Sequence, residues 1–425
     1  MNDTFYHNLP NGVQIVHRKT HSPVVYVGIM VGAGTRHELP NENGMAHYIE
    51  HCVFKGTKHY TARQIINHIE GIGGEINAYT TKEETTFYAA TLSNHFRTTL
   101  HLLADMVLHP TFSKKETDKE VTVILDEIES YNDSPSELIY DDFENMVFEG
   151  SSLAMPILGT KKTLRRISKS PDIALSWMQQ HYRPERMVLF VLGNVSTQQV
   201  LSAAEKELLA SSPYRPIASS PISHSEASNS PQGVQYPIAA PAASNTRLYK
   251  RHTHQTHIML GSHAYPIGHP KQLTMYLLNN IMGGGSMSSR LYLSLREKHG
   301  LVYNIDSQAV PLSDTGYWNI YLACEPQHKD QCLELCHKEL KQLRDTTLTS
   351  AQLQRALRQL EGQMAISAEN QENNALAMAK QMLYHHHAPA WRETFAKVKE
   401  ITSTQLQEVA NEVFAPEKIY TLLYD

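Results

Sequence analysis

The chain is poor in the features that mark several large classes of protein. Its 425 residues include only four cysteines, too few for a disulfide scaffold, which favours a reducing compartment. Lys and Arg number 38 against 43 Asp and Glu, for a net charge of -5, which argues against a nucleic-acid binder that relies on positive charge. The longest apolar run, Val24–Ala33, is interrupted by two glycines and is too short to span a bilayer.

The N-terminal stretch MNDTFYHNLPNGVQ lacks an apolar core and an Arg-rich amphipathic pattern. It shows no signal or transit peptide, and we therefore expect a cytoplasmic protein with no membrane or nucleic-acid partner. What the chain has in excess is histidine, with 24 residues. This number raises the chance of metal chemistry and also that of accidental metal motifs.

One stretch of biased composition divides the chain. The Ser-, Pro- and Ala-rich run Ser211–Asn245 has no helical or strand period, as is typical of an extended linker. A structureless loop of this length is uncommon inside a compact domain. We therefore expect a catalytic domain over residues 1–212, a linker over 213–247 and a second domain over 248–425.

Both halves show a similar order of strand and helix patterns. In the first half the strands are expected at Val13–Arg18, Val24–Val31, Glu75–Thr80, Thr85–Leu92 and Met187–Leu192, and the helices near Gly44–Phe54, Asn94–Val107 and Lys114–Tyr131. In the second half the strands are expected at His257–Gly261, Leu301–Gln308, Tyr317–Cys324 and Ile419–Leu423, and the helices at Leu273–Ile281, Gln331–Arg344 and Ser350–Tyr384. This order predicts an α+β fold of two similarly built domains, each a mostly antiparallel sheet with helices on one face.

The sharpest motif is H-Y-I-E-H, formed by His47, Glu50 and His51. Histidines at positions i and i+4 lie on one face of a helix, so that both imidazoles can hold one zinc ion. Glu50 reaches the same side, where a carboxylate can act as general base. This spacing is the inverted form of the zincin motif. The alternative is a surface helix with solvated His and Glu side chains.

A zinc site of this kind needs a third protein ligand. Glu120 and Glu127 are seven residues apart, two turns of one helix, beside an apolar stripe. Two carboxylates next to such a stripe indicate a partly buried acidic pair, and buried carboxylates need a metal or another cation. The alternative here is a solvated charged face, which is common on long helices.

Several segments of the chain closely resemble the pitrilysin family of zinc peptidases, which includes the mitochondrial processing peptidases and insulin-degrading enzyme. The segment HYIEHCVFKGT, preceded by VGAGTRHELPNENGMA, resembles the active-site region of that family. Further matching segments are Gly73–Tyr88, His181–Val195 and Met282–Ile305. The resemblance touches most of both halves.

The resemblance implies a metal site. In the family the third ligand is a Glu about 76 residues beyond the second His, and Glu127 stands at this place after His51. The resemblance thus implies a Zn²⁺ cofactor held by His47, His51 and Glu127. It also implies that Glu50 is the catalytic base and that Glu120 supports a ligand from behind.

The resemblance further implies substrate contacts outside the metal motif. Arg296 and Tyr303 match an Arg and a Tyr of the inactive half of the family, where the Tyr can stabilise the oxyanion and the Arg can anchor the substrate. Asn77 and Ala78 match positions on an edge strand that pairs with the substrate backbone. The alternatives are a helix-end Arg, a half-exposed strand Tyr and an ordinary sheet strand.

Other clusters have less specific patterns. The run His385–His387 is interpreted as a solvated helix end, and Cys332 and Cys336 as buried thiols. Cys52 departs from the larger apolar residue usual in the family and is expected to be small and buried.

The sequence therefore predicts a zinc-dependent endopeptidase that hydrolyses extended or unfolded peptides. Family members with two such halves per chain pair up and enclose a chamber, so that a homodimer is expected. The alternative is a catalytically silent or partner-dependent structural subunit of a peptidase complex.

Overall fold

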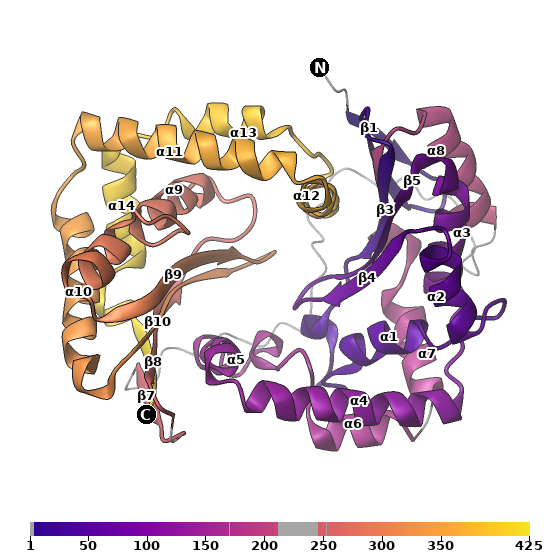
Figure 1. Cartoon of the computed structure of the whole chain (residues 1–425), viewed down its shortest axis with the longest axis horizontal. Helices are drawn as coiled ribbons and strands as arrows, with labels where there is room; N and C mark the ends of the chain where they lie inside the picture. The colour runs from indigo at the N-terminus through magenta and orange to yellow at the C-terminus, as the bar shows by residue number, and fades with distance from the viewer. Residues whose placement is uncertain (1–3, 170, 211–244, 252) are drawn as a thin grey trace. The chain divides into compact units, whose positions relative to one another are not determined.

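The computed structural model describes residues 4–169, 171–210, 245–251 and 253–425. By packing, the chain divides into two compact units. Unit 1 is drawn from Met1–Ile128, Met155–Gln235 and Ser367–Pro389, and unit 2 from Glu129–Ala154, Tyr236–Ile366 and Ala390–Asp425. Each unit contains one β-sheet with helices packed on it (Figure 1), which confirms the predicted α+β class. Most of the predicted linker, residues 213–244, lies outside the described residues.

The sheet of unit 1 has six strands in the order β1-β2-β6-β3-β5-β4. They are β1 (Thr4–Asn8), β2 (Gln14–Lys19), β3 (Val24–Val31), β4 (Glu75–Thr80), β5 (Thr85–Leu92) and β6 (Met187–Gly193). Only β2 and β6 run parallel; the other neighbours are antiparallel. β4 stands at one edge of this sheet.

Within the residues that the structure describes, the sheet of unit 2 repeats this topology with one strand fewer. Its order is β7-β11-β8-β10-β9, and its strands are β7 (Thr246–Tyr249), β8 (Thr256–His263), β9 (Val302–Pro311), β10 (Gly316–Cys324) and β11 (Tyr420–Tyr424). Again a single pair, β7 and β11, is parallel. The five strands thus stand where β2, β6, β3, β5 and β4 stand in unit 1, and β9 is the counterpart of the edge strand β4.

The helices of the two units also follow one order. In unit 1, α1 (Met45–Val53) comes between β3 and the β4–β5 hairpin, and α3 (Phe96–Leu108) and α4 (Lys114–Asn132) come after the hairpin. In unit 2 these places are taken by α9 (Gln272–Met282), α10 (Lys329–Asp345) and α11 (Ser350–Glu369). A 3₁₀ turn with a Pro-Glu-basic sequence, Pro184–Arg186 or Pro416–Lys418, leads into the last strand of each unit.

The two units exchange one helix each. α5 (Pro135–Val147) follows α4 in the chain but packs on β8 and β11 of unit 2. α12 (Gln371–His385) follows α11 but packs on β6, β3 and β2 of unit 1. The domain boundaries expected from the sequence divide the chain into consecutive segments. By packing, however, α5 belongs to unit 2 and α12 to unit 1.

The exchange explains the apolar run of β6. Met187, Leu189 and Val191 face the core beneath α1 and α3, while Val188 and Phe190 face the core formed with α12. Successive side chains point to opposite faces of a strand, so that a strand covered on both faces is apolar throughout. The prediction that helices cover one face of each sheet is therefore wrong, because α12 and α5 cover the second faces.

The prediction of one helix over Ser350–Tyr384 is also wrong. α11 ends at Glu369 and α12 begins at Gln371. The Asn370 side chain caps α12 by accepting a hydrogen bond from the Asn373 amide at 3.0 Å. Asn is a favoured N-cap residue because its side-chain oxygen satisfies a free amide of the first turn. This break allows α11 to pack in unit 2 and α12 in unit 1.

The remaining α-helices lie around these cores. They are α2 (Ala62–Glu70), α6 (Lys161–Ile167), α7 (Pro171–His181), α8 (Thr197–Ala204), α13 (Trp391–Val398) and α14 (Ser403–Val413). Among the described residues, none of the helices combines the length and apolarity needed to cross a membrane.

Candidate metal centre

The metal motif lies on α1, whose first turn is fixed by a buried carboxylate. Glu38 accepts hydrogen bonds from the amides of Gly44 and Ala46, each at 2.8 Å. Gly44 has φ 90°, a conformation that favours glycine. These contacts fix the first turn of α1, on which His47 lies. His51 follows one turn later, and the two imidazole centroids are 4.6 Å apart.

Glu127 of α4 completes a cluster with the two histidines. Its Oε2 atom is 3.7 Å from Nε2 of His47 and 3.5 Å from Nε2 of His51. A tetrahedral zinc ion with ligand bonds of about 2.0–2.2 Å separates its ligand atoms by about 3.3–3.6 Å. The donor set of two imidazoles and one carboxylate, at this spacing, fits zinc. Among the described residues, only these three form a group with metal-binding geometry.

The cluster is buried on one side and open on the other. The side chains of His47 and His51 are 8% and 22% exposed, whereas that of Glu127 is 43% exposed. Burial, with a smaller electrostatic contribution from the neighbouring His51 ring, lowers the pKa of His47 to about 3, so that its imidazole is neutral at pH 7. A neutral imidazole offers the lone pair that a metal requires.

Glu120 contacts His51 from behind the cluster. Its Oε1 lies 2.9 Å from Nδ1 of His51, and its Oε2 lies 2.8 Å from Nζ of Lys55. Burial tends to raise the pKa of Glu120, but the hydrogen bonds from His51 and Lys55 outweigh it and lower this pKa. A proton on Nδ1 is thus held by a carboxylate, which leaves Nε2 free to coordinate.

Glu50 is held by a residue that the sequence did not single out. Thr80, the last residue of β4, donates a hydrogen bond from Oγ1 to Glu50 Oε2 at 2.6 Å. Burial raises the pKa of Glu50 despite this hydrogen bond. A carboxylate with a raised pKa suits general acid–base work near neutral pH. Two sequence signals pointed to these supporting residues. Thr80 lies within the family-like segment Gly73–Tyr88, and Lys55 lies one helical turn beyond His51. Neither spacing by itself identifies a residue that contacts Glu50 or Glu120.

Asn77 and Ala78 lie on the edge strand β4, as predicted. In its register with β5, Asn77 pairs with Tyr88 and Ala78 with Phe87. The other side of β4 has no strand neighbour among the described residues. Their contact with a substrate stays a prediction.

Arg296 and Tyr303 lie together in unit 2. The Arg296 guanidinium is 5.0 Å from the Tyr303 ring centroid and 4.9 Å from that of Tyr292. Tyr303, in β9, is 81% exposed. Their part in the chemistry of the metal centre stays a prediction.

The remaining histidine and cysteine clusters have the structural roles expected from the sequence. His386 ends α12 with φ 54° and lies 2.8 Å from Gln14 Oε1. Cys52, Cys332 and Cys336 are free and fully buried. These residues belong to helix ends and cores.

The models of two protein families match consecutive parts of the sequence. "Insulinase (Peptidase family M16)" matches residues 14–161, which include the metal cluster, Glu50 and Glu120. "Peptidase M16 inactive domain" matches residues 170–360, which include Arg296 and Tyr303. The predicted family resemblance is confirmed.

Individual relatives match nearly the whole chain. An uncharacterized zinc protease of Bacillus subtilis, YmxG, is 31% identical over 416 residues, covering 97% of this chain and 96% of its own. The mitochondrial-processing peptidase subunit beta of Bos taurus is 26% identical over 411 residues, covering 94% and 80%.

Solved structures match the fold. A protease from Helicobacter pylori aligns with TM-score 0.86 at 20% identity, covering 100% of this chain and 99% of its own. A peptidase M16 inactive domain from Pseudomonas fluorescens aligns with TM-score 0.87 at 19% identity, covering 99% and 97%.

Proposed function

The chain belongs to peptidase family M16 and is a zinc metallopeptidase, and we propose that it hydrolyses internal bonds of extended or unfolded peptides. In this proposal the metal centre that performs the hydrolysis is formed by the side chains of His47, His51 and Glu127. The observation that carries this assignment is the spacing of the three ligand atoms, which lie within 4.8 Å of one another. When bound there, zinc supplies a Lewis acid that makes water a stronger nucleophile at neutral pH.

Glu50 performs the proton transfers in this proposal. Its carboxylate accepts a proton from the attacking water and later delivers a proton to the leaving amine. The hydrogen bond from Thr80 Oγ1 to Oε2 fixes the orientation of the carboxylate, so that the other oxygen is left for the proton. Glu120 holds the Nδ1 proton of His51 and thereby orients the ring toward the metal.

The edge strand β4 supports the choice of an extended substrate. Its free edge offers backbone groups to a peptide strand, which gives affinity without a strong demand on side-chain identity. Asn77 and Ala78 lie on this strand. By the family resemblance, Tyr303 stabilises the oxyanion and Arg296 anchors the substrate.

We also propose that two chains pair and enclose the peptide in a chamber. This proposal rests on the family resemblance, and light scattering of the purified protein tests it by giving the mass in solution. A cytoplasmic location is supported by the four free, buried cysteines, since thiols persist in a reducing compartment.

Substitution of the base tests the activity. Glu50→Gln keeps the shape of the side chain but removes the proton acceptor, so that cleavage of a quenched peptide should fall by about 100-fold or more. Zinc content should be unchanged, because Glu50 is not among the ligands. The matched control is Glu70→Gln at the exposed end of α2, which should cleave like the wild type.

Two results would contradict the proposal. Full cleavage by Glu50→Gln would show that the base is misassigned. A folded wild-type protein that neither binds zinc nor cleaves peptides would favour the alternative, a silent or partner-dependent subunit.

A further inference from the structure

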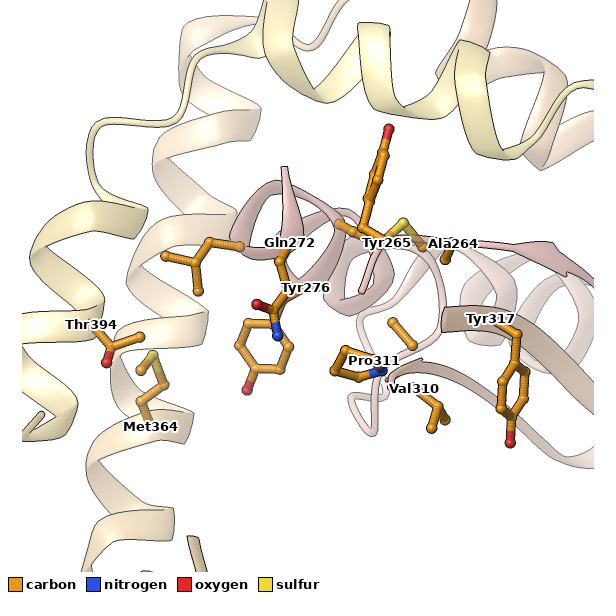
Figure 2. Close-up of a pocket in the computed structure, with 12 residues that line it drawn as sticks. Ala264, Tyr265, Gln272, Tyr276, Val310, Pro311, Tyr317, Met364 and Thr394 are labelled. Carbon is orange, nitrogen blue, oxygen red and sulfur yellow. The ribbon is translucent and has the colours of Figure 1, made fainter. Parts of the chain in front are cut away.

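Unit 2 contains an apolar pocket of about 230 Å³ (Figure 2). Twelve residues line it, and none of the twelve is charged. They come from the chain after β8, the first turns of α9, the β9–β10 hairpin, α11 and α13. In Figure 2 the ring of Tyr276 stands between Met364 and Thr394 on one side and Pro311 on the other.

The pocket uses the counterparts of the elements that build the metal centre. In unit 1, α1 supplies His47 and His51, the end of β4 supplies Thr80, and α4 supplies Glu127. In unit 2, the corresponding α9, the end of β9 and α11 supply Tyr276, Pro311 and Met364. The same place in the repeated topology therefore holds a polar cluster in one unit and an apolar concavity in the other.

Three polar groups of the lining are engaged with the protein itself. The hydroxyls of Tyr265 and Tyr317 donate to Glu412 and Glu144, and Gln272 Oε1 accepts from the Gly268 amide at 2.9 Å. What the pocket offers a ligand is therefore mainly aliphatic and aromatic surface, including the Tyr276 side chain, which is 45% exposed. Such a site selects an uncharged, apolar group.

The volume sets the size of that group. Ligand pockets for drug-sized molecules measure about 300–1,000 Å³, whereas an apolar cavity of about 150 Å³ accepts one benzene ring. The space in unit 2 falls between them and suits one aromatic or large aliphatic side chain.

We propose that this pocket binds one aromatic or large aliphatic side chain of a peptide. The proposal rests on the proposed function, because a peptidase meets its ligands as polypeptide chains. It gives unit 2 a substrate-recognition site of its own, in the place where unit 1 carries its metal ligands. Filling the pocket with such a side chain removes apolar surface of both partners from water.

Ligand-observed NMR on the full chain tests the proposal directly. The probes are N-acetyl-phenylalaninamide and, as the probe without a ring, N-acetyl-alaninamide. The wild type should bind the phenylalanine probe saturably and about tenfold or more tighter than the alanine probe, from the burial of one aromatic side chain.

Two independent variants fill the pocket from different walls. Thr394→Trp acts from α13 and Ala309→Phe from β9, and each should weaken binding of the phenylalanine probe by about tenfold. Circular dichroism establishes that each variant is folded. The matched control is Ile366→Ala, two residues beyond Met364 on α11 and 76% exposed, which should bind like the wild type.

The outcomes separate this proposal from the proposed function. Wild-type binding by both filled, folded variants, or no preference of the wild type for the phenylalanine probe, would overturn the pocket assignment even if peptide cleavage is intact. Binding of toluene but not of the phenylalanine probe would assign the pocket to free small molecules and overturn the peptide side chain. Binding is measured equally well in Glu50→Gln, so that a loss of cleavage does not affect this result.

Discussion

The two units share a strand order but differ in what they place between corresponding elements. Unit 1 brings His47, His51 and Glu127 together from α1 and α4. Unit 2 lines the corresponding place, beside α9 and α11, with uncharged residues. The repeated topology thus provides the same location in both units, and a few side chains on two helices determine the chemistry of that location.

The difference also affects the electrostatics of each unit. Buried ionisable groups need partners to offset the loss of hydration, and unit 1 provides them through Lys55, Glu120 and His51. The lining of the pocket in unit 2 has no charge to compensate. A metal site thus requires a supporting set of charged residues, which unit 2 lacks at the corresponding lining.

Removal of the third proposed ligand should have the largest effect on zinc binding in unit 1. Glu127→Gln replaces an anionic oxygen with a neutral amide, so that zinc affinity should fall by more than about 100-fold and cleavage should be lost with it. Zinc titration against a competing chelator measures the change. Asp126→Asn, at the exposed neighbouring position, is the matched control, and equal zinc affinity of both variants would refute the assignment of Glu127.

Loss of the carboxylate behind His51 should have a smaller effect. Glu120→Gln keeps a hydrogen-bond acceptor near Nδ1 of His51 but replaces the carboxylate with a neutral amide, which accepts a weaker hydrogen bond. Zinc affinity should therefore fall by about 10–100-fold. The same titration measures it. Glu116→Gln on the same helix, where Glu116 pairs with Lys119 at 2.9 Å, should bind zinc like the wild type, and a loss of equal size there would indicate a general charge effect instead.

The helix exchange predicts which unit each core substitution weakens. Met382→Ala in α12 creates a cavity against the sheet of unit 1 and should cost about 2–5 kcal/mol there. Phe143→Ala in α5 creates one against the sheet of unit 2 and should cost about 3–5 kcal/mol there. Hydrogen exchange should rise in β6 and β3 for the first variant and in β8 and β11 for the second; the reverse pattern would contradict the exchange.

The last prediction concerns the acid sensitivity of unit 1. Burial, with the charge of Arg186, lowers the pKa of His37 to about 3, whereas the unfolded chain titrates near 6.5. The stability that neutral His37 contributes is present above pH 6.5 and is lost as the pH falls toward 3, by about 2 kcal/mol at pH 5. The acid arm of an unfolding curve should therefore be flatter in His37→Gln, and not in His21→Gln at an exposed position. Identical acid arms in both variants would contradict this cause.

The three proposed metal ligands could be predicted because they depend on local spacing and on a family pattern. His47 and His51 are one helical turn apart, and Glu127 stands at the family distance from them. The role of Thr80 could not be predicted in this way, because its contact with Glu50 depends on how the end of β4 packs against α1. Nothing in the spacing of 30 residues indicates it.

The fold shows the same limit. Most strands follow from local patterns in the sequence, but β1 is missed, and β7 begins inside the predicted linker 213–247. The exchange of α5 and α12 depends on long-range packing that no period reveals. One local signal was present, since the uninterrupted apolar run of β6 indicates burial on both faces. The break at Asn370 was hidden within a continuous helical pattern, because an N-cap residue is also tolerated inside a helix.

Anomalous diffraction at the zinc absorption edge, on crystals grown with zinc, tests the contrast between the units most directly. We expect one peak per chain, about 2.0–2.2 Å from Nε2 of His47, Nε2 of His51 and the Glu127 carboxylate, and no peak beside Met364 in unit 2. A peak in the pocket of unit 2, or none at the three ligands of unit 1, would contradict it.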